Sequence, residues 1–105
     1  MPARKLKMSH PGAILREEFL EPMSLSAYAL AKGLQVPVPR VNDIVREKRG
    51  ISAEMALLFG AFFGTSETFW LNLQAHYELA CVRPKLARRL ADVRRRRVRL
   101  QRTQG

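Results

Sequence analysis

The segment 25–49, LSAYALAKGLQVPVPRVNDIVREKR, limits the possible folds of this chain more than any other segment. Ser26 is a favourable N-cap, so a first short helix is expected to begin directly after it. Pro37 and Pro39 are tolerated in a helix only at its start, where backbone N–H groups have no partner inside the helix. They therefore mark the start of a second short helix, joined to the first by a tight turn.

The two predicted helices each have an apolar side and a polar side. Apolar residues recur at helical spacing and are expected to face inward: Leu30, Ala31 and Leu34 in the first helix, then Val41, Ile44 and Val45 in the second. Polar residues are expected to face outward or to lie in the following loop: Arg40, Asn42, Asp43, Arg46, Lys48 and Arg49. A plain helical hairpin with a solvated charged face also fits this pattern. The long cationic and amide side chains favour instead a helix-turn-helix unit, whose second helix enters the major groove of DNA.

The positive charge of the chain is concentrated at its C-terminal end. The formal net charge is +10, yet residues 1–82 hold 9 Lys and Arg against 8 Asp and Glu. Residues 83–105 hold 10 Lys and Arg against Asp92 alone. The excess therefore belongs to a tail and says little about the folded part. With 105 residues, 47% of them hydrophobic, the chain is expected to form one domain with one modest core.

A basic lead-in over 1–9 is expected to precede the first helix of the domain. That helix follows the HPG sequence at 10–12, carries apolar residues at 14, 15, 19 and 20, and ends at Pro22. His10 has no neighbour at metal-ligand spacing, so it is interpreted as a structural turn residue.

Two more helices are expected after the central pair. Ser52 caps a helix whose apolar residues are expected to form core, and Gly64 ends it; these residues are Met55, Leu58, Phe59, Phe62 and Phe63. Thr65 or Ser66 caps a fifth helix over 66–82. Its large apolar residues are expected to divide between the core and a dimer seam; they are Phe69, Trp70, Leu73 and Tyr77.

The Arg83-Pro84 pair predicts a boundary between a domain over 10–83 and an Arg-rich tail over 84–105. The tail admits three interpretations. It is a solvated, partly disordered segment; or it is an arm that folds onto nucleic acid, where cations that meet phosphates release counterions. In the third, Leu86, Leu90 and Val93 pack on the domain as a kinked helical extension.

The sequence contains no nucleophile–base constellation, no Gly-rich phosphate loop and no CxxC pair. We therefore predict no catalytic residue, no metal site and no cofactor, and a protein that is not an enzyme. Cys81 is the single cysteine, so an internal disulfide is excluded, and a reducing compartment suits it. Because the sequence also lacks the apolar run of a signal peptide or a membrane span, a cytoplasmic protein without membrane contact is expected.

Three motifs in one order resemble a known family. They are HPGAILREEFLEP at 10–22, ALAKGLQVPVPRVNDIVREKRGIS at 29–52 and FGTSETFWLNLQAHYEL at 63–79. The chain resembles the antitoxins of HigB/HigA-type toxin–antitoxin modules, also described as VapI-like plasmid-maintenance antidotes, within the Xre-like helix-turn-helix group. The resemblance covers about residues 8–80.

This resemblance implies an all-α, five-helix, lambda-repressor-like domain that dimerises on a palindromic operator in its own promoter. It also implies a cognate HigB-like toxin that cleaves mRNA and is neutralised by this chain. Dimerisation is expected on physical grounds too, because two recognition helices must lie about 34 Å apart to read two half-sites. Two alternatives stay open: a stand-alone Xre-like regulator without a toxin, and an RNA-binding protein driven by the tail, although aromatic stacking platforms are absent.

The chain departs from the family pattern at three positions. Gln35 stands in the turn where the family usually has Gly, which predicts a strained turn. Ala27 replaces a polar phosphate anchor, a role that Tyr28 is expected to take. Pro39 replaces a small hydroxyl residue, which removes one hydrogen bond to DNA.

Helix-turn-helix spacing, counted from Ala31, then predicts which side chains meet DNA. Val38, Pro39, Asn42 and Asp43 are expected nearest the base edges, where an amide suits adenine and a carboxylate accepts from cytosine. Arg40 is expected to reach a guanine or a phosphate, and Arg46, Lys48 and Arg49 are expected to bind phosphates.

Overall fold

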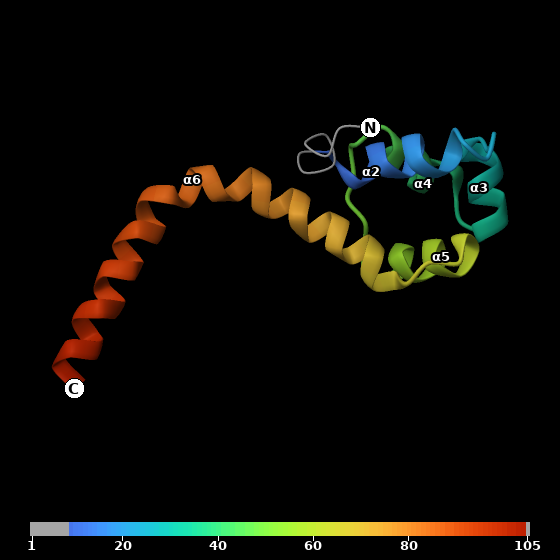
Figure 1. Ribbon diagram of the computed structural model, residues 1–105. Coiled ribbons are helices and arrows are strands. Elements are labelled where there is room, and N and C mark those ends of the chain that lie inside the picture. The colour runs from blue at the N-terminus through green and yellow to red at the C-terminus, as the bar shows by residue number, and fades with distance from the viewer. Residues whose placement is uncertain (1–8, 105) are drawn as a thin grey trace.

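The computed structural model describes residues 9–104, where the regular secondary structure is all helical (Figure 1). The elements are α2 (Pro11–Ile14), η1 (Leu15–Leu20), α3 (Ala27–Leu34), α4 (Val38–Val45), α5 (Ala53–Phe63) and α6 (Glu67–Gln104). α2 and η1 form one continuous helix whose second part has π-helical winding. Counted in this way, residues 9–104 contain the five helices predicted from the sequence. Of the predicted basic lead-in, all but Ser9 lies outside the described residues.

His10 begins the first helix. Its Nδ1 accepts a hydrogen bond from the backbone N–H of Gly12 at 2.9 Å, and the residue is only 7% exposed. Its ring stands edge-on to Tyr77 of α6, with 4.8 Å between the ring centroids. The predicted structural role of His10 is confirmed, because it caps one helix and packs against another.

Gly12 allows α2 to lie directly against α4. A Cβ atom at this position would collide with the backbone carbonyl oxygen of Ile44, and backbone cannot move aside as a flexible side chain can. The glycine of the HPG sequence is therefore required by the close approach of these two helices. It sets the position of α4, the second helix of the predicted helix-turn-helix.

The predicted helix caps are confirmed. Ser26 accepts a hydrogen bond from the N–H of Ala29 at 3.0 Å, and Ser52 accepts one from that of Met55 at 3.2 Å. Gly64 ends α5 in the left-handed conformation, with φ of 75°. Of the two candidates for the α6 cap, Ser66 accepts from the N–H of Phe69 at 3.0 Å. Thr65 instead accepts from the indole N–H of Trp70 at 2.8 Å.

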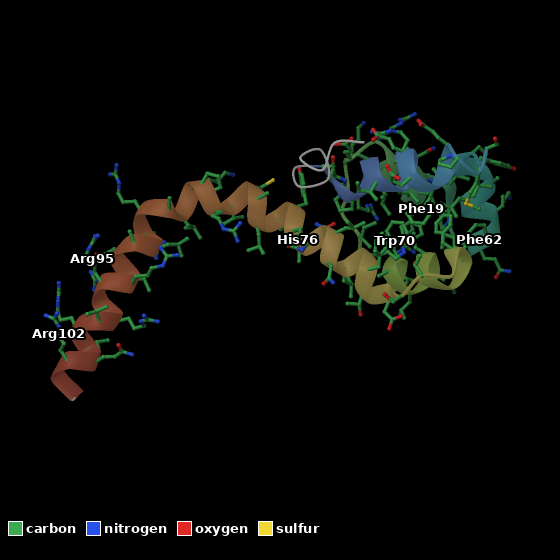
Figure 2. The ribbon with its side chains drawn as sticks, in the orientation of Figure 1. Phe19, Phe62, Trp70, His76, Arg95 and Arg102 are labelled. Carbon is green, nitrogen blue, oxygen red and sulfur yellow. The ribbon has the colours of Figure 1, made fainter. Side chains whose placement is uncertain are left out.

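Aromatic rings from three helices form the centre of the core. Trp70 is fully buried, and its ring centroid lies 4.9 Å from that of Phe19 and 5.0 Å from that of Phe59. Figure 2 shows Phe19 and Trp70 inside the domain and Phe62 toward its edge. Trp70 therefore belongs to the core and not to a dimer seam. The prediction of Phe62 as core is wrong: it is 39% exposed and covers Gly33 of α3.

The predicted end of the fifth helix before Pro84 is wrong. α6 continues through Pro84 to Gln104 and changes direction part-way along its length (Figure 1). Proline removes one helical hydrogen bond and crowds the preceding turn, which bends a helix without ending it where both sides are exposed. Of the alternatives for the tail, the helical one is found. Packing on the domain is not, because this part of α6 projects away from it and Val93 is 57% exposed.

Candidate nucleic-acid interface

α3 and α4 form the predicted helix-turn-helix. Leu30, Ala31, Val41 and Ile44 are completely buried between the two helices and the rest of the domain. Because Ala31 has only a methyl side chain, α4 can pack close to α3 at this point. The apolar face predicted from the sequence is confirmed, with Leu34 also buried and Val45 half-buried.

The turn between the two helices is built around Gln35. Its backbone is left-handed, with φ of 61° and ψ of 44°, and its N–H donates to the carbonyl of Lys32 at 3.2 Å. This is the conformation that glycine adopts without cost, so the strain predicted for the turn is present. Pro37 directly precedes α4 as its N-cap residue, and Pro39 lies in the first turn, as predicted.

The outward face of α4 presents the predicted base-reading residues. Helical spacing places Pro39, Asn42, Asp43 and Arg46 on one side of α4, opposite Val41 and Ile44. Pro39 and Arg46 are exposed, whereas Asn42 and Asp43 are half-buried.

The other predicted contact residues surround this face. Val38 and Arg40 are half-buried at the start of α4, Lys48 and Arg49 are exposed in the loop after it, and Tyr28 is 59% exposed on α3. The Nζ of Lys32 lies 5.5 Å above the ring centroid of Tyr28. Lys32 thus adds a cation that the sequence analysis missed, although its i,i+4 spacing from Tyr28 on a helix was visible.

Two ion pairs hold charged residues of α4. Arg40 donates to the carboxylate of Glu54, the second residue of α5, at 2.9 Å. Asp43 lies 3.9 Å from the guanidinium of Arg49. Arg40 therefore points toward α5, and one nitrogen of its guanidinium is held by Glu54. The sequence analysis missed this partner because it lies on another helix.

Arg16 is a second residue that the sequence analysis missed. One guanidinium nitrogen donates to the backbone carbonyl of Val45 at 2.6 Å, and the other donates to Glu47 at 3.2 Å. Val45 is the last residue of α4, where unpaired carbonyls carry the negative end of the helix dipole. Arg16 thus ties the C-terminal end of α4 to η1.

Residues 9–104 contain neither a metal-ligand cluster nor a membrane-spanning helix. Among residues 9–104, no three His, Cys, Asp or Glu side chains gather as metal ligands would. Within the same residues, no helix combines the length and the hydropathy needed to cross a bilayer.

Comparison with known proteins gives the family. The chain is 54% identical over 81 residues to virulence-associated protein I of Dichelobacter nodosus, covering 75% of each chain. It is 42% identical over 73 residues to an HTH-type transcriptional regulator of Haemophilus influenzae, covering 70% of this chain and 68% of the other. The solved structure of Pseudomonas aeruginosa antitoxin HigA with the higBA promoter matches at 51% identity and a TM-score of 0.75, over 79% of this chain and 90% of that one. No family model matches the sequence.

The chain belongs to the HigA/VapI family of helix-turn-helix antitoxins. This is a family of DNA-binding regulators and not of enzymes. The five-helix architecture of this HigA/VapI-family chain agrees with that of the P. aeruginosa antitoxin.

Proposed function

We propose that this HigA/VapI-family chain is an antitoxin that binds operator DNA in its own promoter and represses it. The observation that carries the proposal is the outward face of α4, in a chain 51% identical to an antitoxin whose structure contains its promoter. This face consists of residues that can contact bases, surrounded by cations that can contact phosphates. Since a repressor acts where its DNA lies, we place the protein in the bacterial cytoplasm.

The proposed contacts divide into two kinds. Asn42 and Asp43 read base edges together with the apolar contacts of Val38 and Pro39. Arg46, Lys48 and Arg49 neutralise phosphates, and Tyr28 of α3 contacts the DNA backbone. Arg40 joins one group or the other after it leaves Glu54.

We further propose that the chain binds DNA as a homodimer. A single α4 is 8 residues long and reads few base pairs, so specific affinity requires a second recognition helix about one turn of DNA away. The partly exposed aromatic and aliphatic residues of α5 and α6 supply apolar surface for such a contact; among them are Leu57, Phe62, Phe69 and Leu71.

The direct test compares Asn42→Ala with Asn72→Ala, the same change at an exposed position of α6. On a duplex from the region upstream of its own gene, Asn42→Ala is expected to cost about 1–3 kcal/mol of binding free energy. On a scrambled duplex of equal length it should change nothing. Lys48→Gln should weaken binding to both duplexes and lower the magnitude of the salt slope by about one unit. Wild-type binding without preference for the promoter duplex would contradict the proposal.

The toxin partner follows from the family and needs its own experiment. We propose that the chain neutralises a HigB-like ribonuclease encoded beside it. Co-expression with the adjacent reading frame, followed by pull-down and growth assays, tests this directly.

A second candidate, a stand-alone regulator, is favoured by the 42% identity to an HTH-type transcriptional regulator. Promoter binding together with no captured neighbour and no rescue from toxicity would select that second candidate.

A further inference from the structure

The C-terminal half of α6 is a strongly charged helix held away from the domain. We define residues 83–102 as the basic arm. It contains all 10 Lys and Arg residues of the last 23 positions and one acidic residue, Asp92. It is the extended orange-to-red part of Figure 1, and it makes the molecule 60 Å long but only 26 and 22 Å in its other two dimensions.

The charges of the basic arm lie in a row along the helix. The row has alternating spacings of three and four residues, so its members fall on one face; they are Lys85, Arg88, Arg95, Arg99 and Arg102, with Asp92 between them. Figure 2 shows Arg95 and Arg102 on the same outer side of α6. Asp92 is the one negative charge in the row, and it lies 3.6 Å from Arg95 and 3.0 Å from Arg96. The row therefore presents five cations along one face of the arm, interrupted once by Asp92.

Such a surface favours an anionic partner, because like charges this close repel one another along a free helix. Two features favour a phosphate backbone over a lipid surface. Helices that lie on membranes use aromatic and aliphatic residues to enter the bilayer, and residues 83–105 contain no aromatic residue. The apolar line of the arm lies on the side away from the row and is interrupted by Arg97; it consists of Leu86, Leu90, Val93 and Leu100.

We propose that the basic arm binds the phosphate backbone of DNA flanking the operator. This inference rests on the proposed function, since operator binding by α4 is what brings the arm to DNA. α6 joins the arm to the DNA-binding domain without a flexible linker, so its local concentration at the flanking DNA is high. Twenty helical residues span about 30 Å, which is about nine base pairs of DNA. The row consists of arginine and lysine, which bind phosphates in any sequence, so the arm adds affinity without base preference.

The test uses two quadruple variants of the full chain. In one, four cations of the row, Arg88, Arg95, Arg99 and Arg102, are all replaced by Gln; in the matched control, the same four are replaced by Lys. Both replacements are good helix formers, and circular dichroism checks that the helix content is equal. Binding is measured from 50 to 300 mM salt on the promoter duplex with flanks, on a scrambled duplex of the same length, and on the promoter duplex with its flanks removed.

The Gln variant is expected to lower the magnitude of the salt slope by about 3.6 units, since each of the four phosphate contacts contributes about 0.9. The loss of affinity should be equal on the promoter and scrambled duplexes and absent on the trimmed one, and the Lys variant should match wild type. Unchanged binding by the Gln variant would overturn the inference, as would a loss confined to the promoter sequence. If the Gln variant lost binding only to phosphatidylserine vesicles and not to DNA, the arm would be assigned to a lipid surface instead.

The two proposals fail in distinguishable ways. If wild type shows no preference for the promoter duplex over the scrambled one, operator recognition is wrong. The difference between the Gln and Lys variants on the scrambled duplex still decides whether the arm binds DNA.

Discussion

The guanidinium of Arg40 and the carboxylate of Glu54 are joined by a hydrogen bond of 2.9 Å that links the start of α4 to the first turn of α5. Glu54 is the more exposed partner, with 64% of its side chain accessible against 29% for Arg40. The pair therefore holds a cation of the proposed DNA-binding face beside a carboxylate. DNA must compete with Glu54 for this cation.

The first prediction concerns this competition. Glu54→Gln removes a negative charge from the edge of the interface and releases Arg40. The affinity for the promoter duplex should therefore rise two- to fivefold. This change equals about 0.4–1 kcal/mol of binding free energy, as expected for an exposed ion pair. The free energy of unfolding should fall by about 0.3–1 kcal/mol, because an acidic residue in the first turn stabilises α5.

Fluorescence anisotropy on labelled duplex and chemical denaturation measure the two effects. Glu67→Gln is the matched control, since Glu67 also lies in the first turn of a helix but belongs to α6. A fall in affinity on Glu54→Gln would mean that Glu54 positions Arg40 for DNA instead of withholding it.

The second prediction concerns the contact between α2 and α4. Gly12→Ala places a Cβ atom on the carbonyl oxygen of Ile44, so the helices must separate, which should cost about 1–3 kcal/mol of unfolding free energy. Gly33→Ala is the control, because there the new Cβ meets the ring of Phe62, a partly exposed side chain that can rotate, and alanine favours the helix. Urea denaturation of both variants measures the difference, and equal stabilities would refute the argument.

The third prediction concerns the turn of the helix-turn-helix. Gln35 is exposed and left-handed, so Gln35→Gly should relieve about 1–2 kcal/mol of backbone strain and lose about 0.5–1 kcal/mol through greater freedom of the unfolded chain. A net gain of up to about 1.5 kcal/mol is expected in thermal denaturation. Gln35→Ala keeps the strain and should gain nothing; a gain of the same size in that variant would mean that strain is not the cause.

The fourth prediction is a pH dependence from His10. Burial lowers the pKa of His10 below its ordinary value of 6.5, and its Nδ1 must be unprotonated to accept from Gly12. The unfolded chain therefore binds this proton more readily than the folded chain. The stability contributed by neutral His10 is complete above pH 6.5 and is lost as the pH falls from there through the lower pKa of the folded state.

Unfolding free energies between pH 5 and 8 measure this loss. His10→Asn keeps a side chain that caps helices but does not titrate, so the decline toward acid pH should become shallower. His76→Asn replaces an exposed histidine and should leave the decline unchanged. If the unfolding free energy of the His10→Asn variant fell toward acid pH as steeply as that of wild type, other groups would cause the acid sensitivity.

The sequence by itself determined the local structure of this protein. Ser26, Ser52 and Gly64 act on backbone groups within a few residues of themselves, so their capping roles follow from the sequence. The apolar spacing of α3 and α4 and the family motifs likewise predicted the helix-turn-helix and its outward residues, whose individual contacts with DNA stay a prediction.

Tertiary structure alone decided the features that join residues far apart in the chain. Arg16 meets Val45 across 29 positions and Gly12 meets Ile44 across 32, and no local pattern encodes either contact. Pro84 was predicted to mark the end of the fifth helix, yet α6 bends and continues, and residues 81–85 are exposed. A cap acts through neighbouring backbone groups, whereas a helix's packing depends on every surface around it, and these surfaces exist only when the chain has folded.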